Sequence, residues 1–239
     1  MKLDCGLIIK NFCLIRGNKE LFKNFTICFE RNKITAILAP SGTGKTSLLE
    51  AIAGLLPYQS GTIECIKDEK QISISYLFQE PRLLPWVNIL QNCMIPLENL
   101  FSKDEAQKRA EHFLSLCNLF DKKNVPPCKL SGGEKQRCSL ARTFAYPAPV
   151  LLMDEAFQSQ DIATKELLFS LFKSILKKEP RTVLLVTHDI KEALALADRI
   201  VVLQHKNNES VLDIYLDKNK NEINSEKIQK EITNILEGV

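Results

Sequence analysis

A glycine-rich segment near the start of the chain has the residue types of a phosphate-binding loop. Residues 39–46 read Ala-Pro-Ser-Gly-Thr-Gly-Lys-Thr, which nearly matches the pattern G-x-x-x-x-G-K-[ST]. An apolar strand-like run precedes this segment and a helix-like run follows it, so backbone amides and the positive end of the helix dipole would face bound phosphates. Lys45 would reach the β- and γ-phosphates of a nucleotide, and the Thr46 hydroxyl would ligate Mg²⁺. The residues expected to contact the nucleotide here are Pro40, Ser41, Gly42, Thr43, Gly44, Lys45, Thr46 and Ser47.

This loop departs from the pattern at one position, because Ala39 stands where glycine is usual. Alanine is the smallest substitute, so we expect the loop to form with a slight adjustment. Gly42 and Gly44 supply the backbone freedom that such a loop needs. The alternative is a glycine-rich turn with an accidental lysine, but the strand before it and the helix after it favour nucleotide binding.

Two consecutive carboxylates end a second apolar run, Val150–Met153. In a doubly wound α/β sheet, the carboxyl end of such a strand lies at the ligand-binding edge. Asp154 would hold Mg²⁺ through water, and Glu155 would take a proton from an attacking water. An acid at a strand end can also solvate a loop or cap a helix. Together with the loop at 39–46, the pair predicts nucleotide hydrolysis.

The overall composition is that of a soluble globular protein. Of 239 residues, 45% are hydrophobic and 26% charged, and 32 basic against 29 acidic residues leave a formal charge of +3. This charge is too small to indicate a dedicated nucleic-acid-binding protein. No apolar run approaches the roughly 18–20 residues of a membrane span. Asp4 and Lys10 interrupt any hydrophobic signal core, so we expect neither an integral membrane protein nor an exported one.

Eight cysteines stand at positions 5, 13, 28, 65, 93, 117, 128 and 138. None forms a C-x-x-C pair, and none lies at metal-ligand spacing from a histidine. Disulfide frameworks are typical of small secreted domains, and most of these cysteines have apolar neighbours. We therefore expect buried, reduced thiols in a cytoplasmic protein.

Strands dominate the first third of the chain, helices dominate the middle, and the two alternate from residue 150 onward. This alternation is typical of an α/β fold with a parallel sheet. The helical middle, from Leu83 to about Tyr146, would be an insertion into the core or a lobe attached to it. Strands are expected at Leu7–Ile9, Leu21–Phe29, Ile34–Leu38, Ile72–Phe78, Val150–Met153, Thr182–Thr187, Arg199–Leu203 and Val211–Leu216, and helices at Ser47–Leu56, around Ile162–Lys178 and from Asp189.

Local signals refine this outline. Three pairs of residues have the spacing of capping boxes at helix starts. Gly61 is expected in a turn. The polar tail after Gln204 contains one amphipathic helix, whose apolar face we expect to pack on the core. The capping boxes pair Ser102 with Glu105, Ser131 with Glu134 and Asp189 with Glu192, and the apolar face comprises Ile228, Ile232, Ile235 and Leu236.

One further motif points to a family. Residues 130–137, Leu-Ser-Gly-Gly-Glu-Lys-Gln-Arg, resemble the LSGGQ signature of the ABC-transporter ATPases, with Glu134 in place of the usual glutamine. A hydroxyl and backbone amides at a helix start form a second anion site, at Ser131, Gly132 and Gly133. A capped helix start without a further role is the alternative. The order of all the motifs along nearly the whole chain supports the resemblance.

Three single residues fall where this family has functional ones. Gln79 follows the strand expected at 72–78, as the family's Q-loop glutamine does, which implies contacts with Mg²⁺ and water. His188 follows Thr182–Thr187 and would be the switch histidine that touches the γ-phosphate. Asp161 falls at the family's D-loop aspartate and would contribute to the nucleotide site. The resemblance thus implies Glu155, His188 and Gln79 as catalytic residues, and Thr46, Gln79 and Asp154 as metal-binding residues.

Two segments depart from the family pattern. Arg16 stands where the family usually has an aromatic residue that stacks on adenine, and a guanidinium plane can also stack on a base. Residues 156–161 read Ala-Phe-Gln-Ser-Gln-Asp instead of the common Pro-Phe-Ser-Ala-Leu-Asp. The polar Gln160 before Asp161 would alter how two D-loops pack in a dimer.

The resemblance also implies an architecture and partners. The fold would be α/β: a P-loop NTPase core with a mainly parallel sheet, an N-terminal antiparallel β subdomain and an inserted helical lobe, all within one ABC-type nucleotide-binding domain. The cofactors would be ATP and Mg²⁺. The partners would be a second copy in an ATP-dependent head-to-tail homodimer, separate transmembrane permease subunits and, indirectly, a periplasmic or extracellular substrate-binding protein, with no nucleic acid. The chain itself would be cytoplasmic and peripheral on the inner face of the cell membrane. The parts would be 1–82 and 147–203 for the core with its β subdomain, 83–146 for the lobe and 204–239 for a polar extension.

Residues 79–86, Gln-Glu-Pro-Arg-Leu-Leu-Pro-Trp, resemble the nitrate/sulfonate/taurine-type importer ATPases. This resemblance implies an importer for a small solute such as a sulfonate or nitrate, or a thiamine precursor. Trp86 is the only tryptophan and would either dock a permease helix or pack the first helix of the lobe. An exporter ATPase and a soluble ABC ATPase outside transport are the alternatives, and the motif at 131–133 disfavours a P-loop kinase.

Overall fold

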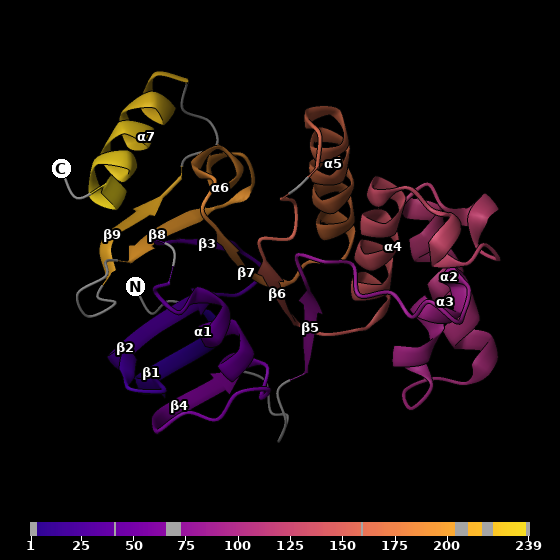
Figure 1. Cartoon of the computed structure of the whole chain (residues 1–239), viewed down its shortest axis with the longest axis horizontal. Coiled ribbons are helices and arrows are strands. Elements are labelled where there is room, and N and C mark those ends of the chain that lie inside the picture. The colour runs from indigo at the N-terminus through magenta and orange to yellow at the C-terminus, as the bar shows by residue number, and fades with distance from the viewer. Residues whose placement is uncertain are drawn as a thin grey trace. The chain divides into compact units, whose positions relative to one another are not determined.

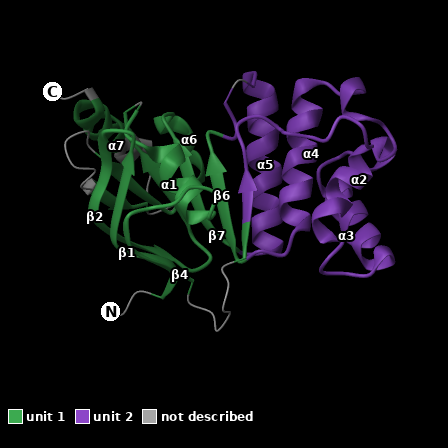
Figure 2. Ribbon diagram, turned by 60° about the horizontal axis from the view of Figure 1, so that its bottom comes forward, with its two compact units in different colours: residues 1–74, 149–155, 181–239 green, residues 75–148, 156–180 purple. Residues whose placement is uncertain are grey.

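The computed structural model describes residues 4–40, 42–65, 73–158, 160–203, 210–216 and 222–237. The chain forms two compact units, drawn in green and purple in Figure 2. The first unit comprises residues 1–74, 149–155 and 181–239, and the second comprises residues 75–148 and 156–180. The finer partition into core, lobe and extension stays a prediction.

An antiparallel sheet in the order β2-β1-β4 opens the first unit (Figure 1). It consists of β1 (Cys5–Arg16), β2 (Lys19–Glu30) and β4 (Ser60–Cys65). The turn expected at Gly61 is wrong, because this glycine lies inside β4 with a φ of 103°. A Cβ at Gly61 would lie 2.6 Å from the Lys10 carbonyl oxygen. Only glycine therefore fits where β4 pairs with the irregular part of β1.

The expectation of reduced cysteines is wrong at two positions, because Cys5 and Cys28 form a disulfide. They lie on the paired strands β1 and β2, and their Cα atoms are 5.7 Å apart, a separation that a disulfide bridges. The register of a long hairpin decides this contact, and cysteine spacing does not show it. Of the other thiols, Cys93, Cys117 and Cys138 are buried as expected, and burial raises the pKa of Cys117 to about 12.

The second sheet of the first unit is mainly parallel, as predicted. In the order β6-β7-β3-β8, its strands run parallel, and β9 pairs antiparallel with β8. Every residue of the four parallel strands is buried, which explains why their sequences are largely apolar. Because the strands point the same way, the segments that follow β3, β6 and β7 meet at one edge. The bounds are Val150–Asp154 for β6, Thr182–Thr187 for β7, Ile34–Leu38 for β3, Arg199–Leu203 for β8 and Ser210–Tyr215 for β9.

Three helices complete the first unit: α1 (Lys45–Ile52), α6 (Ile190–Leu196) and α7 (Glu222–Glu237). Helix α1 is shorter than expected, because Gly54 turns the chain with a φ of 72° soon after Ile52. In α7, Ile232 is fully buried where the helix contacts α6 and β8, so the amphipathic tail helix packs on the core as expected.

The capping box predicted at the start of α6 is only half correct. The Asp189 carboxylate accepts the amide N–H groups of Lys191 and Glu192, which caps the helix. The buried Glu192 carboxylate instead accepts the Thr187 hydroxyl at 3.0 Å. In a full capping box, Glu192 would accept the Asp189 amide. Here the buried Thr187 hydroxyl donates to Glu192 instead.

The second unit consists of one strand and a set of helices around an aromatic core. The ring of Phe144 contacts those of Phe113 and Phe172, and the ring of Phe172 also contacts that of Phe157. The predicted capping boxes at Ser102 and Ser131 are confirmed, and the structure adds one at Asn88. The elements are β5 (Ile74–Leu77), α2 (Ile89–Met94), η1 (Ile95–Leu97), α3 (Lys103–Leu116), η2 (Phe120–Lys122), η3 (Pro127–Lys129), α4 (Gly132–Ala145) and α5 (Ile162–Lys178).

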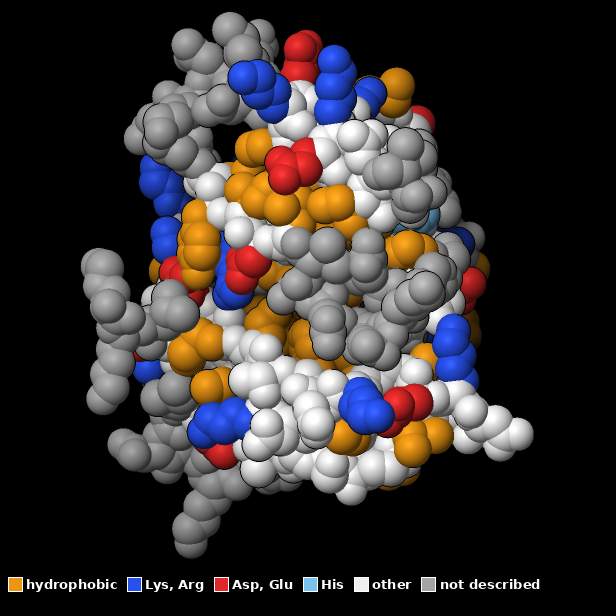
Figure 3. All heavy atoms as spheres, turned by 90° about the vertical axis from the view of Figure 1, so that its left-hand side faces the viewer, with side chains coloured by type: hydrophobic (Ala, Val, Ile, Leu, Met, Phe, Trp, Pro, Cys, Tyr) orange, Lys and Arg blue, Asp and Glu red, His pale blue; other side chains and the backbone are white. Residues whose placement is uncertain are grey.

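The face of the molecule shown in Figure 3 carries charges of both signs. On the face shown in Figure 3, lysine and arginine side chains are interspersed with acidic and apolar ones. Within the ranges given above, no helix combines the length and apolar character that crossing a bilayer requires.

Candidate active site

The loop between β3 and α1 has the backbone geometry of an anion-binding turn. Gly42 and Gly44 have φ values of 76° and 93°, which favour glycine. The Thr43 hydroxyl donates to the Pro40 carbonyl at 2.8 Å and closes the loop. Helix α1 begins directly after Gly44, so its first-turn amides lack intrahelical partners and can bind an anion. Ser41, which the sequence analysis also assigned to the nucleotide, lies outside the described residues.

Lys45 lies over the same loop and is buried, with 7% of its surface exposed. Its Nζ donates to the Ala39 carbonyl at 2.6 Å and to the Pro40 carbonyl at 3.0 Å. Burial lowers the pKa of Lys45, and the carboxylates of Asp154 and Glu155 oppose this only in part. Because a buried ammonium is costly without an anionic partner, this position favours an anion next to Lys45.

Thr46 and Asp154 meet beside the loop. The Thr46 hydroxyl, in the first turn of α1, donates to Asp154 Oδ1 at 3.2 Å, at the end of β6. Hydroxyl and carboxylate oxygens are donors that Mg²⁺ accepts. Among the described residues, no cluster of three or more His, Cys, Asp or Glu side chains could hold a metal alone. The pair therefore fits Mg²⁺ held together with water and nucleotide phosphates, as this ion is usually bound.

Glu155 and His188 also lie together. Glu155 has a φ of 47°, unusual for a residue with a side chain, and its amide donates to the Val186 carbonyl at 2.9 Å. This bond to β7 fixes the turn that follows β6. Glu155 Oε1 lies 3.2 Å from His188 Nδ1, just beyond the end of β7. The side chain of Glu155 is 23% exposed and that of His188 59%, so both can reach a ligand at this edge of the sheet.

The β1–β2 hairpin adds two cations to the loop. Arg16 donates from Nη1 to the Ser47 hydroxyl at 3.1 Å, in the first turn of α1. Lys19 donates from Nζ to the Gly42 carbonyl at 3.0 Å. Arg16 and Ser47 are among the residues predicted from the sequence, and Lys19 is not. Lys19 follows Arg16 closely across a glycine turn, but only the hairpin geometry shows that it reaches the loop.

The remaining candidate residues lie in the second unit. Ser131 is the N-cap of α4, and its hydroxyl accepts the Glu134 amide at 3.2 Å. Gly132 and Gly133 form the first turn of that helix. A Cβ at Gly133 would lie 2.9 Å from the methyl carbon of Thr164, so this position has no room for a side chain.

Asp161 contacts the same threonine. Its carboxylate accepts the Thr164 amide at 2.9 Å and the Thr164 hydroxyl at 2.7 Å, which caps α5. Thr164 thus brings the 131–133 segment and Asp161 together. The next residue, Ile162, is 80% exposed, so an apolar side chain points away from the protein beside Asp161.

Gln79 is exposed in the loop that follows β5. The Arg82 guanidinium carbon lies 4.0 Å from the centroid of the Phe78 ring, so the loop that carries Gln79 folds back on itself. Arg142 of α4 donates from Nη1 to the Arg82 carbonyl and from Nη2 to the Pro81 carbonyl, each at 2.8 Å. The loop is therefore fastened to the helix that begins at Ser131.

Trp86 is 76% exposed, which excludes the alternative that it packs the first helix of the lobe. The buried side chain of Asn92 on α2 forms hydrogen bonds with the backbone of the loop around Trp86. Its Oδ1 accepts the Leu84 amide at 2.7 Å, and its Nδ2 donates to the carbonyls of Leu84 at 3.1 Å and Asn88 at 3.0 Å. The same Nδ2 also donates to the Val87 carbonyl at 3.4 Å, so four hydrogen bonds of one side chain fix the backbone that carries Trp86.

The arrangement has known counterparts. The sequence profile of the ABC transporter family matches residues 22–158, more than half of the chain and both the 39–46 loop and the 131–133 segment. The chain belongs to the ABC transporter ATPases. As a member of this family it is an enzyme that hydrolyses ATP, and its P-loop α/β fold is the one predicted from the motifs.

Relatives and solved structures agree with this family. The chain is 40% identical over 207 residues to the aliphatic sulfonates import ATP-binding protein SsuB of Zymomonas mobilis, covering 85% of this chain and 82% of that protein. It is 36% identical over 190 residues to SsuB 1 of Paracoccus denitrificans, covering 79% and 75%.

Two solved structures are similar in fold. One is the ATP-binding cassette MJ0796, in a dimeric post-hydrolysis state with ADP and inorganic phosphate. The match has a TM-score of 0.74 and 28% sequence identity, and it covers 88% of this chain and 99% of that one. The other is CbiO1 of Clostridium perfringens, part of the transporter complex CbiONQ, with a TM-score of 0.80, 25% identity and coverage of 97% and 95%.

Proposed function

We propose that this ABC ATPase drives an importer for aliphatic sulfonates or a closely related small anion, from the inner face of the cell membrane. The observation that carries the proposal is the 40% identity to an aliphatic sulfonates import ATP-binding protein over 85% of the chain. The importer-type segment at 79–86 agrees with it and lies on the exposed loop that carries Trp86. Nitrate and thiamine precursors are the competing cargoes.

In the proposed reaction, the amides of the 42–46 loop and the Lys45 ammonium bind the β- and γ-phosphates of ATP. Thr46 and Asp154 hold Mg²⁺, which supplies positive charge where phosphoryl transfer develops negative charge. Glu155 accepts the proton of the attacking water. His188, hydrogen-bonded to Glu155 Oε1, orients this carboxylate and contacts the γ-phosphate.

The site is completed by a second copy of the chain. The hydroxyl of Ser131 and the amides of Gly132 and Gly133 would bind the γ-phosphate held by the 39–46 loop of the partner, with Asp161 near the contact. The similarity to a cassette whose structure is a dimer with ADP and phosphate supports this. An isologous pair of copies would bind two nucleotides, because each copy contributes one loop and one signature.

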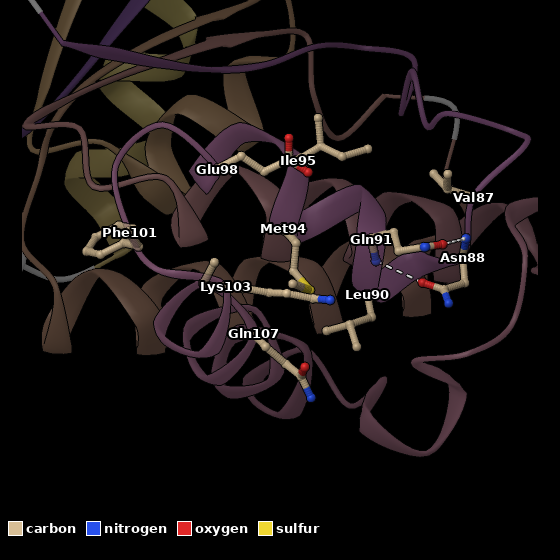
Figure 4. A pocket seen from close by; sticks show the side chains of 11 residues that line it. Val87, Asn88, Leu90, Gln91, Met94, Ile95, Glu98, Phe101, Lys103 and Gln107 are labelled. Carbon is tan, nitrogen blue, oxygen red and sulfur yellow. Dashed lines mark hydrogen bonds between the residues drawn. The ribbon is translucent and has the colours of Figure 1, made fainter.

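The permease would dock on a groove of the second unit (Figure 4). A cavity of about 630 Å³ lies against α2, η1 and α3, beside Val87 and the loop that carries Trp86. Apolar side chains such as Leu90 and Met94 line it, and polar ones such as Gln91 and Lys103 edge it. A short amphipathic helix at the cytoplasmic side of a permease matches this mixture of an apolar floor and a polar rim.

Docking would be connected to the nucleotide through helix α4. Asn92 holds the backbone of residues 84–88 on α2, and Arg142 holds residues 81–82 on α4. The same α4 begins at Ser131, which would bind the γ-phosphate of the partner's ATP. Movement of the docked loop therefore has a hydrogen-bonded route to the signature.

Replacing Trp86 tests the docking part of the proposal. Trp86→Ala should reduce the amount of permease that co-purifies with the tagged chain from membranes by about tenfold or more, because buried tryptophans are typical hot spots worth at least about 2 kcal/mol. Leu55→Ala is the matched control, since Leu55 is 65% exposed but lies in the first unit. Full recovery of the permease with the Trp86 variant would contradict the docking site.

The cargo is tested with the co-purified transporter in sealed vesicles. ATP supplied on the side of this chain should drive uptake of a labelled aliphatic sulfonate, and a variant that cannot bind ATP should not. Uptake of nitrate or of a thiamine precursor in place of the sulfonate would reassign the cargo. Outward movement would make the chain an exporter ATPase, and failure to recover any permease would favour a soluble ABC ATPase.

A further inference from the structure

The signature contains a carboxylate that has two partners of different kinds. Glu134 lies in the first turn of α4, and its Oε2 accepts the Ser131 amide at 2.9 Å. Its Oε1 lies 2.5 Å from Nζ of Lys122, at the end of η2. The side chain of Glu134 is 16% exposed and that of Lys122 is 49% exposed. The ion pair at the start of α4 is therefore partly accessible to solvent.

This carboxylate is placed where negative charge opposes anion binding. The amides of Gly132 and Gly133 and the Ser131 hydroxyl lie in the same helical turn, and the positive end of the helix dipole attracts phosphate there. A fixed negative charge in that turn repels a triphosphate. The bonds from Lys122 and Ser131 lower the pKa of Glu134, so the carboxylate is ionised at neutral pH. The ammonium of Lys122 brings the charge of this pair to zero.

We propose that Lys122 is a positioning residue of the nucleotide site, which acts through Glu134 by neutralising its charge and holding it away from the partner's triphosphate. The proposal rests on the proposed function, in which this signature closes on ATP bound to a second copy. A serine–glycine signature that carries glutamate would then need a cation at η2, and one that carries glutamine would not.

The test measures the dissociation constant of the ATP-bound dimer by sedimentation, at low and at high salt. All variants carry Glu155→Gln, so that ATP is not consumed. Lys122→Met leaves the pair at charge −1, Glu134→Gln leaves it at +1, and the double variant returns it to zero. Lys122→Arg keeps the charge. Lys123→Met is the matched control, because Lys123 is the next residue and pairs with Glu111 on α3.

We expect Lys122→Met to weaken the dimer about tenfold at low salt, since one charge at a helix start changes anion affinity about threefold and the dimer contains two such sites. Glu134→Gln changes the charge of the pair by one unit in the opposite direction at the same two sites, so it should tighten the dimer by up to about tenfold. The double variant and Lys122→Arg should stay within about twofold of the parent. Lys123→Met should also stay within about twofold, and all differences should shrink at high salt.

A purely structural ion pair behaves differently. If the pair only tethers η2 to α4, Lys122→Met and Glu134→Gln break the same tether and weaken the dimer in the same direction, which would overturn the proposal. Equal affinities for all variants would overturn it as well while leaving the proposed function intact. A parent that does not dimerise with ATP would overturn both.

Discussion

Glu155→Gln is expected to bind ATP normally, to hydrolyse it about 10²–10⁴-fold more slowly and to accumulate as an ATP-bound dimer. The amide of glutamine keeps the size of the side chain but cannot accept the proton of the attacking water. The backbone turn should survive, because the Glu155 amide, not its side chain, donates to the Val186 carbonyl. Turnover is measured as phosphate release, and dimer formation by sedimentation with ATP and with ADP.

The matched control for this substitution is Glu64→Gln, at an exposed carboxylate on β4 that pairs with Lys10. It makes the same chemical change away from the nucleotide and should keep turnover within about twofold of the parent, as is usual for surface substitutions. Normal turnover by the Glu155 variant would remove its role as the base. A Glu155 variant that stays monomeric with ATP would contradict the shared site.

Lys45→Ala is expected to raise the dissociation constant for ATP at least about 100-fold, because each hydrogen bond to a charged group contributes about 1.5–3 kcal/mol and this ammonium can form more than one. In the structure the Lys45 ammonium donates to the Ala39 and Pro40 carbonyls. Because Lys45 is buried, water solvates its positive charge poorly. Phosphate oxygens are stronger acceptors than these carbonyls. Binding is measured by titration with a fluorescent ATP analogue.

Lys33→Ala is the control for the loss of a lysine near the same sheet, since Lys33 is exposed just before β3, whereas the loop follows the other end of that strand. It should leave ATP affinity within about twofold of the parent. Unfolding temperatures of both variants show whether the fold is retained. Undiminished ATP affinity in a folded Lys45 variant would refute the assignment of the loop.

The buried elements could be predicted closely from the sequence. The bounds of β3, β7 and β8 agree with their largely apolar runs, because strands covered on both faces contain few polar residues. Features that depend on pairing between residues distant in the sequence could not be predicted in this way. The Cys5–Cys28 disulfide follows from the register of β1 on β2, and the place of Gly61 inside β4 follows from its contact with β1.

The same distinction holds at the site. Lys45, Thr46 and the carboxylates after β6 lie in short motifs whose chemistry depends on adjacent residues, so spacing alone identifies them as candidates. Lys19, Asn92 and Lys122 act on backbone or side-chain atoms of other segments. No local pattern marks such a residue, because a lysine in a turn or an asparagine in a helix is usually only solvated or capping.

The most direct test of the account is the ATPase rate per chain as a function of protein concentration, with the fraction of dimer determined by sedimentation in the same buffer. Because the loop of one copy and the signature of the other are proposed to act on the same ATP, the rate per chain should rise in proportion to the dimer fraction and approach zero at high dilution. A chain that is monomeric throughout and hydrolyses ATP at the full rate would contradict the account.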